Sequence, residues 1–204
     1  MSLYDRLILP RLIALAMRAP QLAPFRRRIG GAAEGRVLEL GIGSGLNLPF
    51  YGAAVRAVTG IDPSPALLRL AEARATGLGM TLAVQPGPAE TLPFDAGSFD
   101  TVVTTWTLCS IGDPRAALAE ARRVLRPGGR LLFVEHGLAP DPRVARWQHR
   151  LTPAWRHIAG GCHLDRRIDS LVGGAGFRIE TMEAAYVGGP RVATYFYSGA
   201  ARPL

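Results

Sequence analysis

The chain has 204 residues, of which 48% are hydrophobic, and its formal net charge is +8. This length fits one domain with a sizeable core, and the composition excludes disorder of the whole chain. Two cysteines are too few for a disulfide framework, no segment is typical of a signal peptide, and no apolar run is long enough to span a membrane. We therefore expect a cytoplasmic protein with reduced thiols.

The positive charge comes entirely from arginine, because the chain contains no lysine. Such a balance can attract nucleic acid or anionic membranes. However, the arginines are spread along the chain, and the densest cluster is only Arg26 to Arg28. We therefore expect no nucleic-acid partner, and the sequence gives no indication of the oligomeric state.

Residues 1–30 are predicted to form an N-terminal helical arm. Apolar residues recur in it at helical spacing, at Ile8, Leu12, Leu15 and Ala19. Pro10 and Pro20 limit the helix or bend it. Two interpretations stay open: the arm packs on the domain or over its active site, or it lies on an anionic membrane surface as a peripheral contact at the inner membrane.

Residues 31–204 are predicted to form one domain in which strands and helices alternate. Strands are expected at residues 36–40, 57–61, 80–85, 99–105 and 130–135. Ser64 and Asp113 are expected to cap helices that run to about Thr76 and to a point before Pro127. This alternation predicts a parallel sheet with helices on both faces.

The last third of the chain has a different pattern. Asp141-Pro142 and Thr152-Pro153 each resemble helix starts, and Asp165 is expected to cap a helix that ends near Gly176. Two strands, at residues 177–187 and 192–198, follow with a very short connection. That connection is too short for a parallel crossover, so the pair should be antiparallel.

A glycine-rich turn, from Gly41 to Gly45, directly follows the first predicted strand and its Glu39. Glycines allow a tight turn and a close approach of the backbone to a ligand. Asp62 ends the second strand, about twenty residues later, where an acid can hold ribose hydroxyls. Leu46 stands where a dinucleotide fingerprint has its third glycine, so the pattern disfavours a nicotinamide oxidoreductase.

The acid followed by G-x-G-x-G resembles motif I of the class I S-adenosylmethionine-dependent methyltransferases. Residues 89–94 and 97–100 resemble the adenine-side loop and fourth strand of that superfamily, and residues 125–129 resemble its turn before the fifth strand. The resemblance implies an α/β, Rossmann-like seven-stranded and mostly parallel sheet with an antiparallel C-terminal strand. It also implies S-adenosylmethionine as the cofactor.

The resemblance implies a set of cofactor-binding residues: Glu39, Gly41, Gly43, Gly45, Asn47, Asp62, Pro63, Ala89, Glu90 and Thr105. Glu39 and the glycine turn should hold the methionine part, and Asp62 the ribose. Ala89 and Glu90 should flank the adenine, and Thr105 should line the reactive end. Many relatives carry an acid where this chain has Pro88, so backbone groups are expected to contact the adenine.

Methyl transfer is a direct displacement in which alignment supplies much of the rate. His136 ends the fifth strand and is the candidate catalytic base, although a histidine that only orders a loop is the alternative. Trp106, Cys162 and His163 are the candidate substrate contacts. No metal is expected, because zinc sites usually show paired ligands at characteristic spacings.

Residues 107–110, 135–136, 153–155 and 161–162 resemble a narrower group, the methyltransferase-like 7 proteins, which are alkyl thiol S-methyltransferases. The chain also resembles bacterial quinone-biosynthesis methyltransferases. The resemblance implies methyl transfer to a small-molecule acceptor, with a thiol favoured. The alternatives are a quinol or phospholipid methyltransferase at the membrane surface, and a non-catalytic S-adenosylmethionine-binding protein.

Overall fold

In a computed structural model of the protein, residues 9–204 are described. Ile8 of the predicted arm therefore lies outside the described residues. The strands are β1 (Gly35–Leu40), β2 (Val55–Asp62), β3 (Leu82–Pro86), β4 (Phe99–Thr105), β5 (Leu125–His136), β6 (Phe177–Tyr186) and β7 (Tyr195–Pro203).

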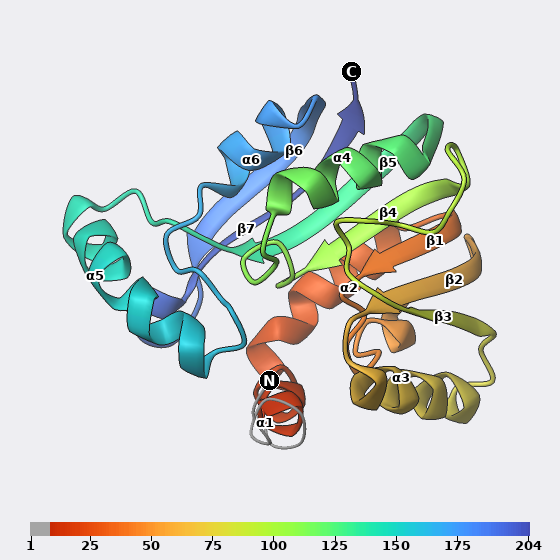
Figure 1. Ribbon diagram of the computed structural model, residues 1–204, viewed down its shortest axis with the longest axis horizontal. Coiled ribbons are helices and arrows are strands. Elements are labelled where there is room, and N and C mark those ends of the chain that lie inside the picture. The colour runs from red at the N-terminus through yellow and green to blue at the C-terminus, as the bar shows by residue number, and fades with distance from the viewer. Residues whose placement is uncertain (1–8) are drawn as a thin grey trace.

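The strands form a seven-stranded sheet in the order β3-β2-β1-β4-β5-β7-β6 (Figure 1). The first five strands pair in parallel, whereas β7 pairs antiparallel with both β5 and β6. The predicted fold, including one antiparallel C-terminal strand, is therefore confirmed. The order reverses between β1 and β4, and in open α/β sheets ligands bind beside the carboxyl ends of strands at such a point.

The helices are α1 (Leu9–Ala16), α2 (Ala23–Ala32), α3 (Pro65–Gly77), α4 (Pro114–Val124), α5 (Pro142–Ile158) and α6 (Ile168–Gly174), with short 3-10 turns at Pro20–Leu22, Leu48–Phe50 and Arg191–Ala193. Helices α4 and α6 cover one face of the sheet, and α2 and α3 cover the other (Figure 1). Among the described residues, every helix is too short or too polar to cross a bilayer.

The core follows the alternation of side chains along each strand. In β5, Leu131 and Phe133 pack beneath α4 and α6, whereas Leu132 and Val134 pack beneath α2. All four are buried, and burial of each such side chain stabilises the fold by about 1.5–3 kcal/mol. The same alternation sends Glu135 and His136, at the end of β5, to opposite faces.

Two predicted helix starts are confirmed by their caps. The Ser64 hydroxyl accepts a hydrogen bond from the Leu67 N–H at the start of α3. The Asp113 carboxylate accepts hydrogen bonds from the N–H groups of Arg115 and Ala116, each at 3.0 Å, at the start of α4. Caps of this kind are each worth about 1 kcal/mol.

The predicted helix start at Thr152-Pro153 is wrong, because α5 continues from Pro142 to Ile158 with Pro153 inside it. The Thr152 hydroxyl donates to the Gln148 carbonyl one turn earlier, at 2.8 Å, so its side chain bonds within the helix. Gln148 is fully buried and bonds the Gly137 carbonyl and the Ala139 N–H. These bonds dock α5 beside the end of β5.

Two further local predictions need correction. Asp165 does not cap a helix, because α6 begins at Ile168 and the Asp165 carboxylate instead lies 2.9 Å from His149 Nδ1. The predicted turn at residues 125–129 falls inside β5, which begins at Leu125. Gly128, with a φ of 78°, lies within this irregular stretch, where the pairing with β4 shifts register.

The predicted boundary between arm and domain falls within α2, which runs from Ala23 to Ala32. Ile29 is buried against the sheet, and a Cβ at Gly30 would lie 2.3 Å from the Phe50 carbonyl oxygen. This part of the arm therefore packs tightly on the domain, and a division at residue 30 stays a prediction.

Candidate active site

A cavity of about 680 Å³ opens at the carboxyl ends of β1, β2, β4 and β5. Helix α1 and the end of α5 form its outer walls, and they lie close together, since a Cβ at Gly160 would lie 2.7 Å from Ile13 Cδ1. The cavity brings together most of the predicted site residues: Glu39, Gly41, Gly43, Asp62, Pro63, Thr105, Trp106, His136 and Cys162.

The glycine turn presents backbone to the cavity. Gly41 and Gly43 have φ values of 65° and 56°, which favour glycine. A Cβ at Gly41 would lie 2.4 Å from Thr107 Oγ1, whereas a Cβ at Gly43 would meet only the Gly41 carbonyl oxygen, at 3.9 Å, so this side of Gly43 is open. That open side, beside the polar edge described next, fits a bound nucleoside cofactor.

Asp62 forms the polar edge of this half of the cavity. Its carboxylate accepts the Gly43 N–H at 3.0 Å and the Ser64 N–H at 2.8 Å, so the side chain is held in one orientation. Asp62 is 93% buried (7% exposed) and burial raises its pKa. The carboxylate keeps lone pairs free for hydroxyl donors, as the predicted role at the ribose requires.

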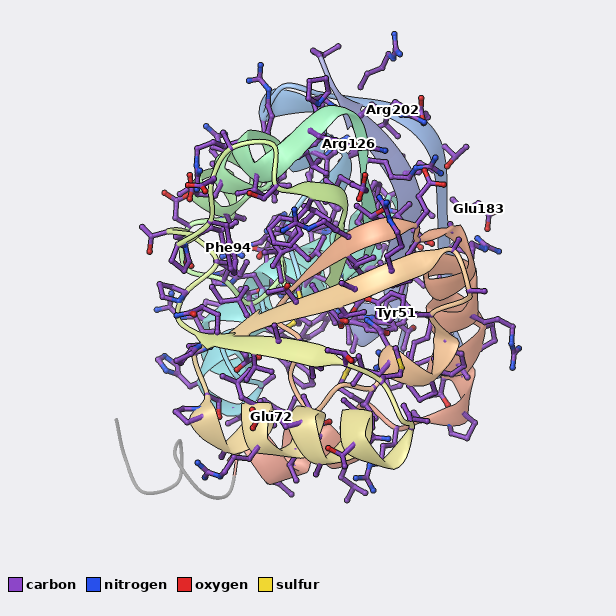
Figure 2. All side chains as sticks on the ribbon, turned by 90° about the vertical axis from the view of Figure 1, so that its right-hand side faces the viewer. Tyr51, Glu72, Phe94, Arg126, Glu183 and Arg202 are labelled. Atoms are coloured by element: carbon purple, nitrogen blue, oxygen red, sulfur yellow. The ribbon has the colours of Figure 1, made fainter. Side chains whose placement is uncertain are left out.

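Glu39 lies at the centre of a buried hydrogen-bond network. Its carboxylate accepts bonds from Asn47 Nδ2 at 2.6 Å and from the Tyr51 hydroxyl at 2.8 Å. Asn47 Nδ2 also donates to Thr105 Oγ1 at 2.9 Å. Burial raises the pKa of Glu39 to about 7, although these two donors oppose the shift. Figure 2 shows Tyr51 on the side of the sheet that α3 covers.

Arg26 of α2 supports the same network from outside. Its guanidinium donates to Asn47 Oδ1 at 2.6 Å and to the Met17 carbonyl at 3.1 Å, so it links the residue that follows α1 to the Glu39 network. It also lies 4.7 Å from the centre of the Trp106 ring. Burial lowers the pKa of Arg26 to about 10, so the side chain stays positive at neutral pH.

The other half of the cavity is apolar and aromatic. Phe196 of β7 packs edge-on against Trp106 and against His136, with ring centres 5.8 and 6.1 Å apart. Trp155 and Ile158 of α5 complete this wall. Such a lining excludes water and favours an apolar ligand.

His136 and Cys162 meet in this apolar half. His136 Nδ1 lies 3.5 Å from the Cys162 sulfur. His136 Nε2, Trp106 Nε1 and Trp155 Nε1 are buried and find no hydrogen-bond partner within residues 9–204. Leaving buried donors and acceptors unpaired is costly, so these atoms favour a ligand with a polar group here.

Glu135, which directly precedes His136 in β5, bonds the loop after β4 and not the histidine. Its carboxylate accepts bonds from the Thr104 hydroxyl at 2.7 Å, the Thr107 N–H at 3.1 Å and the Cys109 N–H at 3.2 Å. Burial raises its pKa to about 7. Glu135 therefore holds the loop after β4, in which Trp106 adopts a positive φ of 52°.

Five predicted site residues lie outside the cavity lining: Gly45, Asn47, Ala89, Glu90 and His163. A Cβ at Gly45 would lie 2.7 Å from Leu48 Cδ1, so this glycine permits close packing. Asn47 acts through Glu39 and Thr105, as described above. Ala89 is buried in the core, and the Glu90 carboxylate accepts the Asp113 N–H. Contact of these residues with a ligand stays a prediction.

Sequence reasoning missed several residues of the site. Arg26 was noticed only as part of an arginine run, and Tyr51 and Phe196 were not singled out at all. Phe196 lies 60 residues beyond His136 in the chain and meets it only because β7 pairs with β5. Nothing in the run of three consecutive arginines indicated that Arg26 would be buried.

Comparison with known proteins agrees with this geometry. Residues 38–133 match the family described as a methyltransferase domain. The chain is 42% identical over 142 residues to human thiol S-methyltransferase TMT1B, an alignment that covers 67% of this chain and 57% of that protein. It is 38% identical over 172 residues to phosphatidylethanolamine N-methyltransferase of Cereibacter sphaeroides, covering 79% of each.

The crystal structure of a SAM-dependent methyltransferase from Thermotoga maritima has the same fold, with a TM-score of 0.69 and 20% identity. The match covers 98% of this chain and all of that chain. By contrast, the chain spans little more than half the length of the thiol S-methyltransferases that it matches.

Proposed function

Because the chain belongs to the S-adenosylmethionine-dependent methyltransferase family, we propose that it transfers the methyl group of this cofactor to the sulfur of a small organic thiol. The observation that carries the proposal is the position of His136, whose Nε2 has no hydrogen-bond partner among residues 9–204 and lies in an apolar half-cavity continuous with the polar half at Asp62. Similarity to human TMT1B supports the thiol as acceptor.

The polar half is proposed to bind the cofactor. S-adenosylmethionine supplies a methyl group that its sulfonium charge makes electrophilic. The Asp62 carboxylate would accept hydrogen bonds from ribose hydroxyls, and the open side of Gly43 leaves room beside them. Glu39 and Thr105 also line the cavity, and Thr105 directly precedes Trp106 of the aromatic wall, so these two would contact the methionine part.

The apolar half is proposed to bind and activate the acceptor. A thiolate is a far better nucleophile than a thiol, so a nearby base raises the rate. His136 would take the thiol proton at Nε2. A hydrogen bond from Nδ1–H to the Cys162 sulfur would leave the lone pair at Nε2, which is the tautomer that this role needs. The rings of Trp106, Trp155 and Phe196 would keep water away.

The test is transfer of a labelled methyl group from S-adenosylmethionine to a panel of acceptors. The panel contains an alkyl thiol, sulfide, a phenol, a quinol and phosphatidylethanolamine vesicles. We expect label on the alkyl thiol at a rate well above that on the phenol. Label on the quinol or the lipid, with none on any thiol, would contradict the proposed acceptor.

A second candidate acceptor is a quinol or phospholipid taken from a membrane surface. Leu12 and Ile158 at the cavity rim are 50% and 63% exposed, and nearby Leu15 of α1 is 66% exposed. Exposed apolar side chains of this size favour contact with a lipid surface. The relative from Cereibacter sphaeroides, named for phosphatidylethanolamine, supports this candidate.

Flotation with vesicles separates the two candidates. If a lipid is the acceptor, the chain should float with anionic vesicles, and Leu12→Asp with Leu15→Asp should abolish flotation together with lipid methylation. Leu70→Asp with Leu78→Asp is the matched control, because Leu70 on α3 and Leu78 just after its end are also exposed. If the chain never floats but methylates a thiol, the lipid acceptor is excluded and the thiol acceptor is supported.

A further inference from the structure

Cys109 and Cys162 are the two cysteines of the chain, and both line the acceptor half of the cavity. They come from segments more than fifty residues apart, the loop after β4 and the turn after α5. The Cys109 carbonyl accepts the His163 N–H at 2.7 Å, and a Cβ at Gly161 would lie 2.8 Å from the Ser110 carbonyl. The two cysteine-bearing segments therefore run side by side.

The backbone around the two cysteines favours a disulfide. A disulfide needs a Cα separation of about 4.4–6.8 Å, and the hydrogen bond from the His163 N–H to the Cys109 carbonyl holds the two cysteine-bearing backbones against each other. Both side chains line the same cavity, and each thiol shifts the pKa of the other. Methyl transfer as proposed above requires neither thiol as a nucleophile.

The two thiols differ in their surroundings. Cys162 is partly exposed, and hydrogen bonding from Cys109 and His136 lowers its pKa to about 5. Cys109 is 2% exposed, and its interaction with Cys162, together with burial, raises its pKa. Arg166 lies near both, which further favours a negative sulfur. An accessible thiolate beside a buried thiol is the usual division between an attacking and a resolving cysteine.

We propose that Cys162 and Cys109 form a redox-active pair that reacts with small organic disulfides entering the apolar half of the cavity. The Cys162 thiolate attacks one sulfur of the disulfide, whose S–S bond breaks as a mixed disulfide forms on Cys162. Cys109 then loses its proton and attacks the Cys162 sulfur, which releases the second organic thiolate. Two electrons pass from the cysteines to the disulfide, and their two protons end on the released thiols.

The reaction would turn the oxidised form of a thiol into the reduced form inside the pocket that methylates thiols. In this respect alone the inference rests on the proposed function, because exchange itself needs no S-adenosylmethionine. A cysteine disulfide across the apolar half would also remove the Cys162 thiolate beside His136. Methyl transfer should then stop until a dithiol reductant restores the pair.

The experiment treats the purified chain with diethyl disulfide in the absence of S-adenosylmethionine and follows intact mass. The native chain should lose two hydrogen atoms and keep no ethyl group, with release of two ethanethiols. Cys109→Ser should stop at one ethylthio adduct on Cys162. Cys162→Ser should react about tenfold or more slowly, because the remaining thiol is buried.

Because the chain has no other cysteine, each mass is assigned without ambiguity. Alanine versions of both variants and their thermal melts separate loss of chemistry from loss of fold. A stable ethyl adduct on the native chain, or equal rates for Cys162→Ser and the native chain, would overturn the proposal. Since S-adenosylmethionine is absent, neither result bears on methyl transfer, and failure of methyl transfer would not explain either.

Discussion

The two halves of the cavity are built in different ways. The polar half, from Glu39 to Asp62, comes from one short stretch of chain, in which two strand ends and a glycine turn place backbone N–H groups and carboxylates. The apolar half gathers the loop after β4, the end of β5, the end of α5 and β7. The first half is local in sequence, and the second depends on the whole sheet.

This difference indicates which half binds the cofactor and which half selects the acceptor. Hydrogen bonds from a strand end and a turn suit a ligand that does not change, such as a cofactor. A wall of side chains from distant segments can change shape by substitution at any one of them, and so suits the acceptor. Substitutions in one half should therefore leave the function of the other half intact.

The largest effect is expected for His136→Ala, in the apolar half. If His136 takes the thiol proton, kcat should fall by about 100- to 10,000-fold, the range for a general base. The loss should be smaller for more acidic thiols, which need less help. The affinity for S-adenosylmethionine, measured by calorimetry, should stay unchanged.

His149→Ala is the control, because the His149 side chain is exposed and its Nδ1 lies 2.9 Å from Asp165 rather than in the cavity. An equal loss for all thiols, or a weakened affinity for the cofactor, would place His136 in a structural role rather than in proton transfer.

The polar half could be predicted from the sequence because its signals are local. A buried strand followed by glycines and an acid at the end of the next strand indicate a site without knowledge of distant contacts, and Glu39, Gly43 and Asp62 lie as expected along the cavity. The sheet could also be predicted, since each strand and cap has a local pattern. Partners in the apolar half, such as Phe196, depend on strand pairing that no short pattern records.

Helix ends in the last third were harder to predict for a similar reason. Pro153 normally indicates a helix start, but here α5 continues through it and is docked by buried Gln148. Tertiary contacts therefore keep α5 continuous through Pro153, although the local sequence predicts a new helix there.

The next effect is expected for Asp62→Ala, in the polar half. The variant loses a carboxylate that accepts two backbone N–H bonds and that we propose accepts ribose hydroxyls. Hydrogen bonds to charged groups are worth about 1.5–3 kcal/mol, so the Kd for S-adenosylmethionine should rise roughly 10- to 100-fold. Asp95→Ala, at an exposed turn, should leave the Kd unchanged. An unchanged Kd for Asp62→Ala would remove this residue from the cofactor site.

The smallest effect is expected in the pH dependence of the free energy of unfolding. One buried acid from each half, Glu39 and Glu135, contributes to it. Burial raises the pKa of both Glu39 and Glu135 from 4.5 to about 7, so the folded chain binds these protons more tightly than the unfolded chain does. Stability should therefore fall as pH rises from about 4.5 to about 7. Glu135→Gln and Glu39→Gln should each reduce that fall, by roughly 1–3 kcal/mol at most.

Urea unfolding at several pH values measures this slope. Glu72→Gln is the control for loss of a charge, because Glu72 lies on the outer side of α3 (Figure 2). If the slope stays the same in both buried variants, other groups would have to account for the pH dependence.

The place of β7 in the sheet has a consequence for how the chain is made. β7 follows β6 in the sequence, yet it lies between β5 and β6. During synthesis the ribosome releases residues 39–62 long before residue 196, and domains fold as their segments emerge. The polar half of the cavity should therefore be able to form in the nascent chain before β7 completes the apolar half. Residues 195–203 then insert between β5 and β6, and this insertion is the step that completes the sheet.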